Sequence, residues 1–273
     1  MPAFIGLIRT MRPKQWTKNG IIYAGLVFDG QLLVPDSFLR VTVSFILLCL
    51  VSSTIYIVND LVDIESDRQH PRKRKRPLPS GQLPVPLAIA ASVIIPIVAV
   101  GMALLYSPAF ALVLVMYLVL HLAYSFRLKH IVILDVLSIT AGFILRVAAG
   151  VVVIQVAQFS PWLYGCAGML ALFLAIGKRR QELLELADQA GSIRVIFKHY
   201  NLALLDDMLR IAMIITMMSY LLYTIEAPSA LLEGTNLALL TTPFVLYGMF
   251  RYLYLIHVKG EGSAPDEVLL KDR

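Results

Sequence analysis

The segment LRVTVSFILLCLVSSTIYIVNDLVDIESD, residues 39–67, joins a long apolar stretch directly to a cluster of carboxylates. Residues 39–59 are mostly apolar and are long enough to cross a bilayer, for which a helix needs about 20 such residues. The sequence therefore predicts an all-α, polytopic membrane bundle that forms a single integral membrane domain over residues 1–273. Seven further stretches have similar length and composition: residues 16–33, 85–106, 109–126, 132–155, 161–178, 204–226 and 236–257.

The composition of the whole chain supports a membrane protein. Hydrophobic residues make up 58% of the chain and charged residues 15%, and the mean hydropathy is +0.75. A soluble domain is about half apolar and a quarter charged. The composition therefore excludes an ordinary soluble domain.

The basic residues are distributed unevenly along the chain. The net charge of +6 would be compatible with a nucleic-acid partner, but 20 of the 24 Lys and Arg residues lie at the two ends and in every second loop. The intervening loops contain neither residue type. By the positive-inside rule, both termini and the basic loops are expected in the cytoplasm, with the chain in the cytoplasmic membrane and without a nucleic-acid partner.

The carboxylates of NDLVDIESD, residues 59–67, are spaced for metal binding. Asp60, Asp63 and Asp67 are at positions i, i+3 and i+7, which places them on one face of a helix over about 10 Å. Magnesium is usually held by one or two carboxylates together with phosphate oxygens. We therefore predict that all three are catalytic metal ligands for Mg²⁺ and a diphosphate. The alternative interpretation is a solvated acidic helix end.

A basic run, HPRKRKRPLPSG, follows at residues 70–81. Such a run often only sets topology or binds lipid head groups. Next to a carboxylate cluster, however, cations and a metal ion could together neutralise a diphosphate leaving group. Arg74 and Arg76 are therefore candidate substrate-binding residues, assisted by Asn59.

NDLVDIESD followed by KRKRPLPSG resembles the UbiA superfamily of intramembrane prenyltransferases. The stretch YSFRLKH, residues 124–130, is similar to the tyrosine–lysine element of that family, which implies that Tyr124 and Lys129 bind substrate. The resemblance implies a bundle of eight to nine helices around a central cavity, with magnesium and diphosphate at its cytoplasmic mouth. It also implies association into a small homo-oligomer.

The place of the family's second aspartate motif reads differently in this chain. Aromatic prenyltransferases of the family carry a second acidic cluster there, whereas this chain has GKRRQELLELAD at residues 177–188. It offers Glu182 together with the cations Lys178, Arg179 and Arg180. The simpler interpretation is a charged helix flank.

Four other stretches resemble a phosphoribosyltransferase branch of the superfamily: MRPKQWTKN (11–19), LDVLSITAGFILRVAAG (134–150), YNLALLDDMLRI (200–211) and DEVLLKDR (266–273). This resemblance implies transfer of 5-phosphoribose from phosphoribosyl pyrophosphate to a polyprenyl (decaprenyl) phosphate, a step toward cell-wall arabinan. For this reaction the available cations are Lys14, Lys18, Arg146, Lys178, Arg179 and Arg180. The other predicted substrate-binding residues are Asn19, Asp135, Glu182 and Tyr200.

The residues are compatible with that reaction. The acceptor phosphate is already anionic at neutral pH, so the site needs cations to position it and no general base. The alternative enzyme is a prenyltransferase that moves a polyprenyl group from its diphosphate to an aromatic or quinone-precursor acceptor. A transporter would place functional charges near the membrane midplane, whereas the dense cluster here lies at one face. A lipid-binding scaffold would explain the basic loops but not the carboxylates.

Two charge pairs within apolar stretches leave alternatives open. Asp135 and Arg146 are 11 residues apart and should face the same side of one helix, where they either pair with other elements or line the active site. Asp206 and Arg210 have the i, i+4 spacing of a helix salt bridge, but they also lie in the stretch 200–211 that resembles the family.

Overall fold

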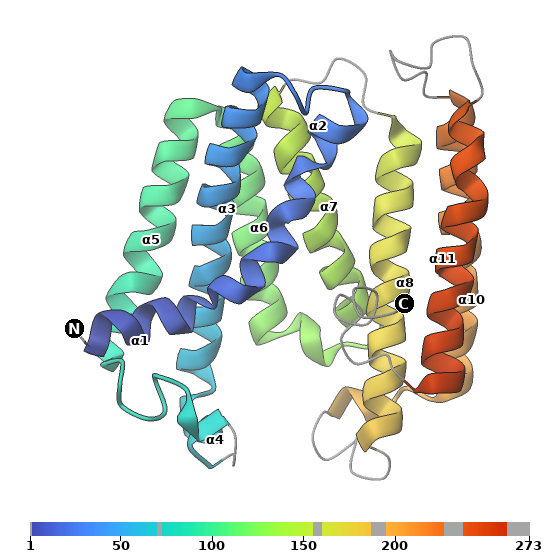
Figure 1. Ribbon diagram of the computed structural model, residues 1–273. Coiled ribbons are helices and arrows are strands. Elements are labelled where there is room, and N and C mark those ends of the chain that lie inside the picture. Colours follow the sequence, from blue (N-terminus) through green and yellow to red (C-terminus); the bar gives the residue numbers. More distant parts are fainter. Residues whose placement is uncertain (1, 70–72, 155–159, 187–194, 227–236, 261–273) are drawn as a thin grey trace. The chain divides into compact units, whose positions relative to one another are not determined.

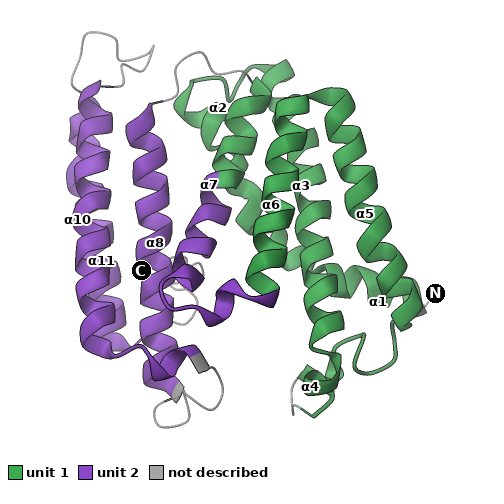
Figure 2. Ribbon diagram, turned by 180° about the vertical axis from the view of Figure 1, so that it is seen from behind, with its two compact units in different colours: residues 1–125, 145–157 green, residues 126–144, 158–273 purple. Residues whose placement is uncertain are grey.

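The computed structural model describes residues 2–69, 73–154, 160–186, 195–226 and 237–260, and the regular elements within these ranges are all helical. The backbone forms two compact units (Figure 2). Unit 1 comprises residues 1–125 and 145–157, and unit 2 comprises residues 126–144 and 158–273. Each unit is described by itself.

Unit 1 is built around the long helix α3 (Figure 1). Helix α5 packs along α3, and both α1 and the 3₁₀ helix η1 contact α3. The buried core of this unit includes Leu48, Phe110 and Tyr117. Its elements are α1 (Pro2–Met11), η1 (Pro13–Tyr23), α2 (Ala24–Phe28), α3 (Pro35–Val62), α4 (Ile64–Gln69), η2 (Lys73–Lys75), α5 (Val85–Tyr106), α6 (Pro108–Phe126) and the C-terminal part of α7 (Leu134–Ile154).

Unit 2 is built around the packing of α8 against α10. Phe173, Leu209 and Tyr252 lie in its buried core. Its elements are η3 (Leu128–His130), the N-terminal part of α7, α8 (Pro161–Leu186), η5 (Val195–Lys198), α10 (Leu202–Glu226), η6 (Leu237–Thr241), α11 (Thr242–Tyr254) and the π-helical turn η7 (Leu255–Lys259). Helix α8 runs on to Leu186, so the charged segment that begins at Lys178 continues a helix and does not start a loop.

Seven of the described helices are long and apolar enough to cross a membrane, by length and composition. They confirm the predicted all-α, multi-pass membrane fold and are consistent with the expected eight to nine spans. The first predicted span, residues 16–33, differs because η1 is a 3₁₀ helix that is followed by the short α2. The polar residues Lys14, Gln15 and Lys18 lower the hydropathy of η1. That the whole chain forms a single domain stays a prediction.

Helix α7 and η1 approach each other closely in unit 1, and a glycine makes this contact possible. A Cβ atom added at Gly150 would lie 1.9 Å from the carbonyl oxygen of Ile22. Small residues let helix backbones approach in this way within membrane proteins. Gly150→Ala is therefore expected to destabilise the fold by about 2 kcal/mol or more, as overpacking does.

The measurement is thermal unfolding of the purified protein in detergent. Gly101→Ala in α5 is the matched control, because a Cβ atom there would meet no atom within 4 Å. The control should keep or slightly raise the unfolding temperature, since alanine favours a helix more than glycine does. An unfolding temperature of Gly150→Ala equal to that of the control would contradict this packing.

Candidate functional site

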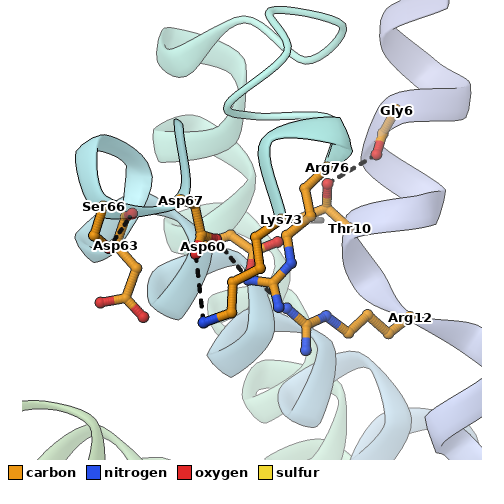
Figure 3. A network of polar contacts seen from close by, with 9 residues as sticks. All are labelled: Gly6, Thr10, Arg12, Asp60, Asp63, Ser66, Asp67, Lys73 and Arg76. Atoms are coloured by element: carbon orange, nitrogen blue, oxygen red, sulfur yellow. Dashed lines mark hydrogen bonds and ion pairs between the residues drawn. The ribbon is translucent and has the colours of Figure 1, made fainter. Parts of the chain in front are cut away.

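A cluster of buried carboxylates and partly exposed cations forms where α3 ends (Figure 3). The Arg12 Nη2 atom donates to Asp60 Oδ1 at 2.5 Å. One nitrogen of Arg76, Nη1, lies 3.2 Å from Asp60 Oδ1 and 2.6 Å from Asp67 Oδ2. Lys73 Nζ is 3.7 Å from Asp67 Oδ1. We call these five residues the carboxylate–arginine cluster.

The carboxylates and the arginines of this cluster differ in the exposure of their side chains, and the difference matters for binding of an anionic ligand. The side chains of Asp60 and Asp67 are only 2% and 1% exposed, whereas those of Arg12 and Arg76 are 32% and 31% exposed. Buried carboxylates need a cation close by, because an unpaired buried charge is strongly destabilising. The cations reach solvent and can therefore also contact an anionic ligand.

The expectation that three carboxylates share one helix face is wrong. Helix α3 ends at Val62, and Asp63 takes φ −93° and ψ 7°, so the chain bends before α4 begins at Ile64. Figure 3 shows the Asp63 carboxylate directed away from Arg76. Among the described residues, the Asp63 carboxylate forms no hydrogen bond or ion pair. The bend instead brings Asp60 and Asp67 to the same guanidinium.

The donor set of the cluster fits a magnesium ion that is shared with a ligand. No group of three or more His, Cys, Asp or Glu side chains suited to a metal occurs within the part of the chain that the structure describes. Magnesium needs fewer protein ligands than that, because it keeps waters and takes oxygens from substrate phosphates. The shared Arg76 nitrogen shows that one positive group can serve Asp60 and Asp67 together. These two carboxylates would hold the ion.

A second polar network lies in the interior of unit 1. Arg146 Nε donates to Asn19 Oδ1 at 2.8 Å, and Arg146 Nη2 donates to the Tyr117 hydroxyl at 2.6 Å. The Asn19 amide donates to the Ser52 hydroxyl at 3.0 Å. Arg146 therefore contacts other elements, as one of the two alternatives predicted, and Asn19 orients it.

Unit 2 contains an ion pair that is buried on both sides. Arg179 donates through Nε to Asp135 Oδ2 at 2.7 Å and through Nη1 to Glu182 Oε2 at 2.6 Å. The side chains of Arg179 and Asp135 are 4% and 0% exposed. This burial indicates a structural role for the pair within unit 2. Substrate contact by these three residues stays a prediction.

Tyr200 completes this network. Its hydroxyl donates to Asp135 Oδ1 at 2.8 Å and accepts the Ile133 N–H, also at 2.8 Å. Burial raises the pKa of Tyr200, and the hydrogen bond to the Asp135 carboxylate raises the pKa further. Tyr200 therefore keeps its proton and acts as a hydrogen-bond donor.

The predicted i, i+4 salt bridge between Asp206 and Arg210 is wrong. Asp206 Oδ1 accepts from Arg180 Nε at 2.6 Å and lies 3.3 Å from His257 Nε2. Arg210 pairs instead with Asp207 at 2.9 Å. Helix α8 packs against α10, and this packing places Arg180 of α8 within hydrogen-bond distance of Asp206 of α10.

The other predicted residues differ in how far they are exposed. Lys14 and Arg74 are exposed, and Asn59, the residue before Asp60, is half-buried. Lys18 and Tyr124 are half-buried in unit 1, and Lys129 and Lys178 are half-buried in unit 2. Arg12 was missed by the sequence reasoning. Its place directly before Pro13, at the start of a cation-rich segment, was the available signal.

The helical fold and the cluster define a multi-pass membrane protein with a polar site at a helix end. The family model of the UbiA prenyltransferase family matches residues 21–268. A decaprenyl-phosphate phosphoribosyltransferase of Corynebacterium glutamicum is 33% identical over 98% of this chain and 81% of its own length. One of Mycobacterium tuberculosis is 30% identical, over 98% of this chain and 88% of its own length.

The fold comparison agrees with the family match. The structure of a UbiA homologue from Archaeoglobus fulgidus, bound to DMAPP and Mg²⁺, superposes with a TM-score of 0.76 at 19% identity. The alignment covers 97% of this chain and 92% of that one. The chain belongs to the UbiA prenyltransferase family and is a membrane transferase.

Proposed function

We propose that this protein transfers 5-phosphoribose from phosphoribosyl pyrophosphate to a polyprenyl phosphate and releases pyrophosphate, with Mg²⁺ as cofactor. One observation carries the proposal: two enzymes named decaprenyl-phosphate phosphoribosyltransferase are about 30% identical over 98% of this chain. The similarity extends over nearly the whole chain and is not confined to one motif.

The carboxylate–arginine cluster supports the donor side of the reaction. Asp60 and Asp67 would hold Mg²⁺, and Arg76 and Lys73 would contact the pyrophosphate, because these cations already lie at the two carboxylates. When bound, the ion would stabilise the negative charge that develops on the leaving pyrophosphate. Asp63 stays a predicted third ligand, and Asn59 and Arg74 stay predicted assisting residues.

The transfer itself requires positioning of the two substrates and no general base. The bond that breaks joins C1 of the ribose to a pyrophosphate oxygen, and the bond that forms joins C1 to an oxygen of the acceptor phosphate. The acceptor oxygen carries a negative charge at neutral pH, so no residue has to remove a proton. Lys14, Lys18 and Lys178 are the proposed cations that place phosphate groups.

The uneven distribution of basic residues supports a cytoplasmic location of this site and of both termini. A water-soluble donor such as phosphoribosyl pyrophosphate would be available on that side. The polyprenyl chain of the acceptor would remain in the bilayer.

The test supplies purified protein in detergent with two substrate pairs. One pair is phosphoribosyl pyrophosphate with decaprenyl phosphate, and the other is a polyprenyl diphosphate with an aromatic acid. The proposal predicts, by mass spectrometry of the lipid extract, a phosphoribosylated lipid that forms only with Mg²⁺. A prenylated aromatic acid without any phosphoribosylated lipid would refute it in favour of the prenyltransferase.

A further inference from the structure

A strained basic turn follows α1 and borders an open depression. Arg12 has φ 54° and ψ 62°, a left-handed conformation that is unfavourable for a residue other than glycine. The depression has a volume of about 320 Å³ and is lined by Arg9, Arg12, Pro13, Lys14 and Gln15. Three of these five residues are cations, and most of the surface that lines the depression is apolar, which fits an anionic group attached to an apolar chain.

Contacts to α3 hold this turn in place. The Ser53 hydroxyl donates to the Met11 carbonyl oxygen at 3.1 Å, and the Trp16 indole N–H lies 3.0 Å from the same hydroxyl. The Gln15 N–H closes the turn on the Arg12 carbonyl oxygen at 2.8 Å. The surroundings therefore determine the unusual backbone of Arg12, as is typical where strain serves a function.

Arg12 connects the depression to the carboxylate–arginine cluster. Its guanidinium donates to Asp60 and lies 5.0 Å from the centroid of the Tyr56 ring, while the same residue lines the depression. An anion in the depression would therefore lie beside the residue that contacts Asp60. This position suits a second phosphate-bearing substrate.

The helix that leads into the turn indicates what kind of anion this is. Helix α1 crosses the direction of α3 and α5 and does not run along them (Figure 1). Phe4, Ile5 and Ile8 are 65%, 47% and 40% exposed, while Leu7 and Met11 pack on the core of unit 1. An exposed apolar face on a helix with this orientation is typical of a helix that lies in the membrane interface. A lipid with an anionic head group fits both the face and the cations.

We propose that Arg9, Arg12 and Lys14 bind the phosphate head of the polyprenyl phosphate acceptor, with its first isoprene units along Phe4, Ile5 and Ile8. The inference rests on the proposed function, because it assigns the acceptor's place beside the cluster. It assigns the depression to the lipid and not to the soluble donor, because α1 carries the exposed apolar face and also contributes Arg9 to the lining of the depression.

The experiment measures binding of tritiated decaprenyl phosphate to the full-length protein in detergent with EDTA, so that no metal-dependent reaction occurs. The variant is Arg9→Gln/Lys14→Gln. Its matched control is Arg68→Gln/Arg210→Gln, which removes the same charge from two exposed arginines outside the depression. We expect the dissociation constant to rise about tenfold in the variant and to stay within about twofold in the control.

Two competitors separate the sources of phosphate. Decaprenol, which lacks the phosphate, should fail to displace the labelled lipid. Inorganic pyrophosphate supplied with excess Mg²⁺, which can occupy the donor site without allowing transfer, should fail as well. Displacement by magnesium pyrophosphate, or equal weakening by the variant and its control, would overturn the proposal. In steady-state assays, the KM for decaprenyl phosphate should rise about tenfold in the variant, and the KM for phosphoribosyl pyrophosphate should not change.

The two proposals can fail separately. Wild-type protein that binds decaprenyl phosphate with this variant pattern but forms no phosphoribosylated lipid would refute the proposed function and support the depression. Phosphoribosylated lipid formed with an unchanged KM for decaprenyl phosphate in the variant would do the reverse.

Discussion

Replacing Asp67 by asparagine is expected to lower the rate of transfer by about 1000-fold while the protein remains folded. Asp67 is 1% exposed, and its carboxylate lies 2.6 Å from Arg76 and 3.7 Å from Lys73. Asparagine keeps the shape of the side chain but removes the charge that would hold a metal ion. The site would then lose one of its two buried carboxylates, and with it the stabilisation of the leaving pyrophosphate. The measurement is kcat/KM for phosphoribosyl transfer.

Glu65→Gln is the matched control for this prediction. Glu65 lies on the same short helix, α4, but its side chain is 76% exposed and pairs with Arg68. An exposed ion pair contributes little, so the control should keep activity within about twofold. An Asp67→Asn enzyme that folds and retains more than about a tenth of the wild-type rate would show that this carboxylate does not hold the metal.

The largest effect on stability is expected from Asp135→Ala in unit 2. This change leaves the buried Arg179 without the carboxylate that accepts from its Nε atom and removes the acceptor of the Tyr200 hydroxyl. Breaking a buried ion pair from one side costs about 3–5 kcal/mol. The free energy of unfolding, measured by denaturation in mixed micelles, should fall by about that amount.

An exposed pair in the same unit provides the comparison. Asp207 and Arg210 are each 66% exposed, so Asp207→Ala should change the free energy of unfolding by less than about 1 kcal/mol. Equal losses in Asp135→Ala and Asp207→Ala would contradict a structural role of the buried pair. A stable Asp135→Ala protein with reduced donor affinity would support the prediction that Asp135 contacts substrate.

Much of the fold could be predicted from the sequence because membrane spans depend on length and hydropathy alone. The stretch 39–59 predicted α3, and the stretches after it predicted α5 to α8, α10 and the helical segment 237–259. The type of helix in the first predicted stretch, residues 16–33, was harder to predict. The 3₁₀ and α helices bury similar residues and differ in their hydrogen bonds. Polar residues between Pro13 and Asn19 were the only sign that this segment is unusual.

The residue types of the candidate site could be predicted from the sequence, but their arrangement in space could not. Helical spacing placed Asp60, Asp63 and Asp67 together, yet the backbone bends at Asp63 and only two of the carboxylates meet Arg76. A pattern of spacings assumes a continuous helix and cannot reveal such a bend. Ion pairs between different helices could not be predicted either. Asp206 contacts Arg180, which is 26 residues away, and not Arg210.

The role of the carboxylate–arginine cluster in donor binding can be tested with labelled phosphoribosyl pyrophosphate and the purified protein by equilibrium dialysis, with and without Mg²⁺. We expect saturable binding that requires Mg²⁺, is lost in Asp67→Asn and is retained in Glu65→Gln. Binding that persists in EDTA or in Asp67→Asn, or a site that retains geranyl diphosphate but not phosphoribosyl pyrophosphate, would contradict it.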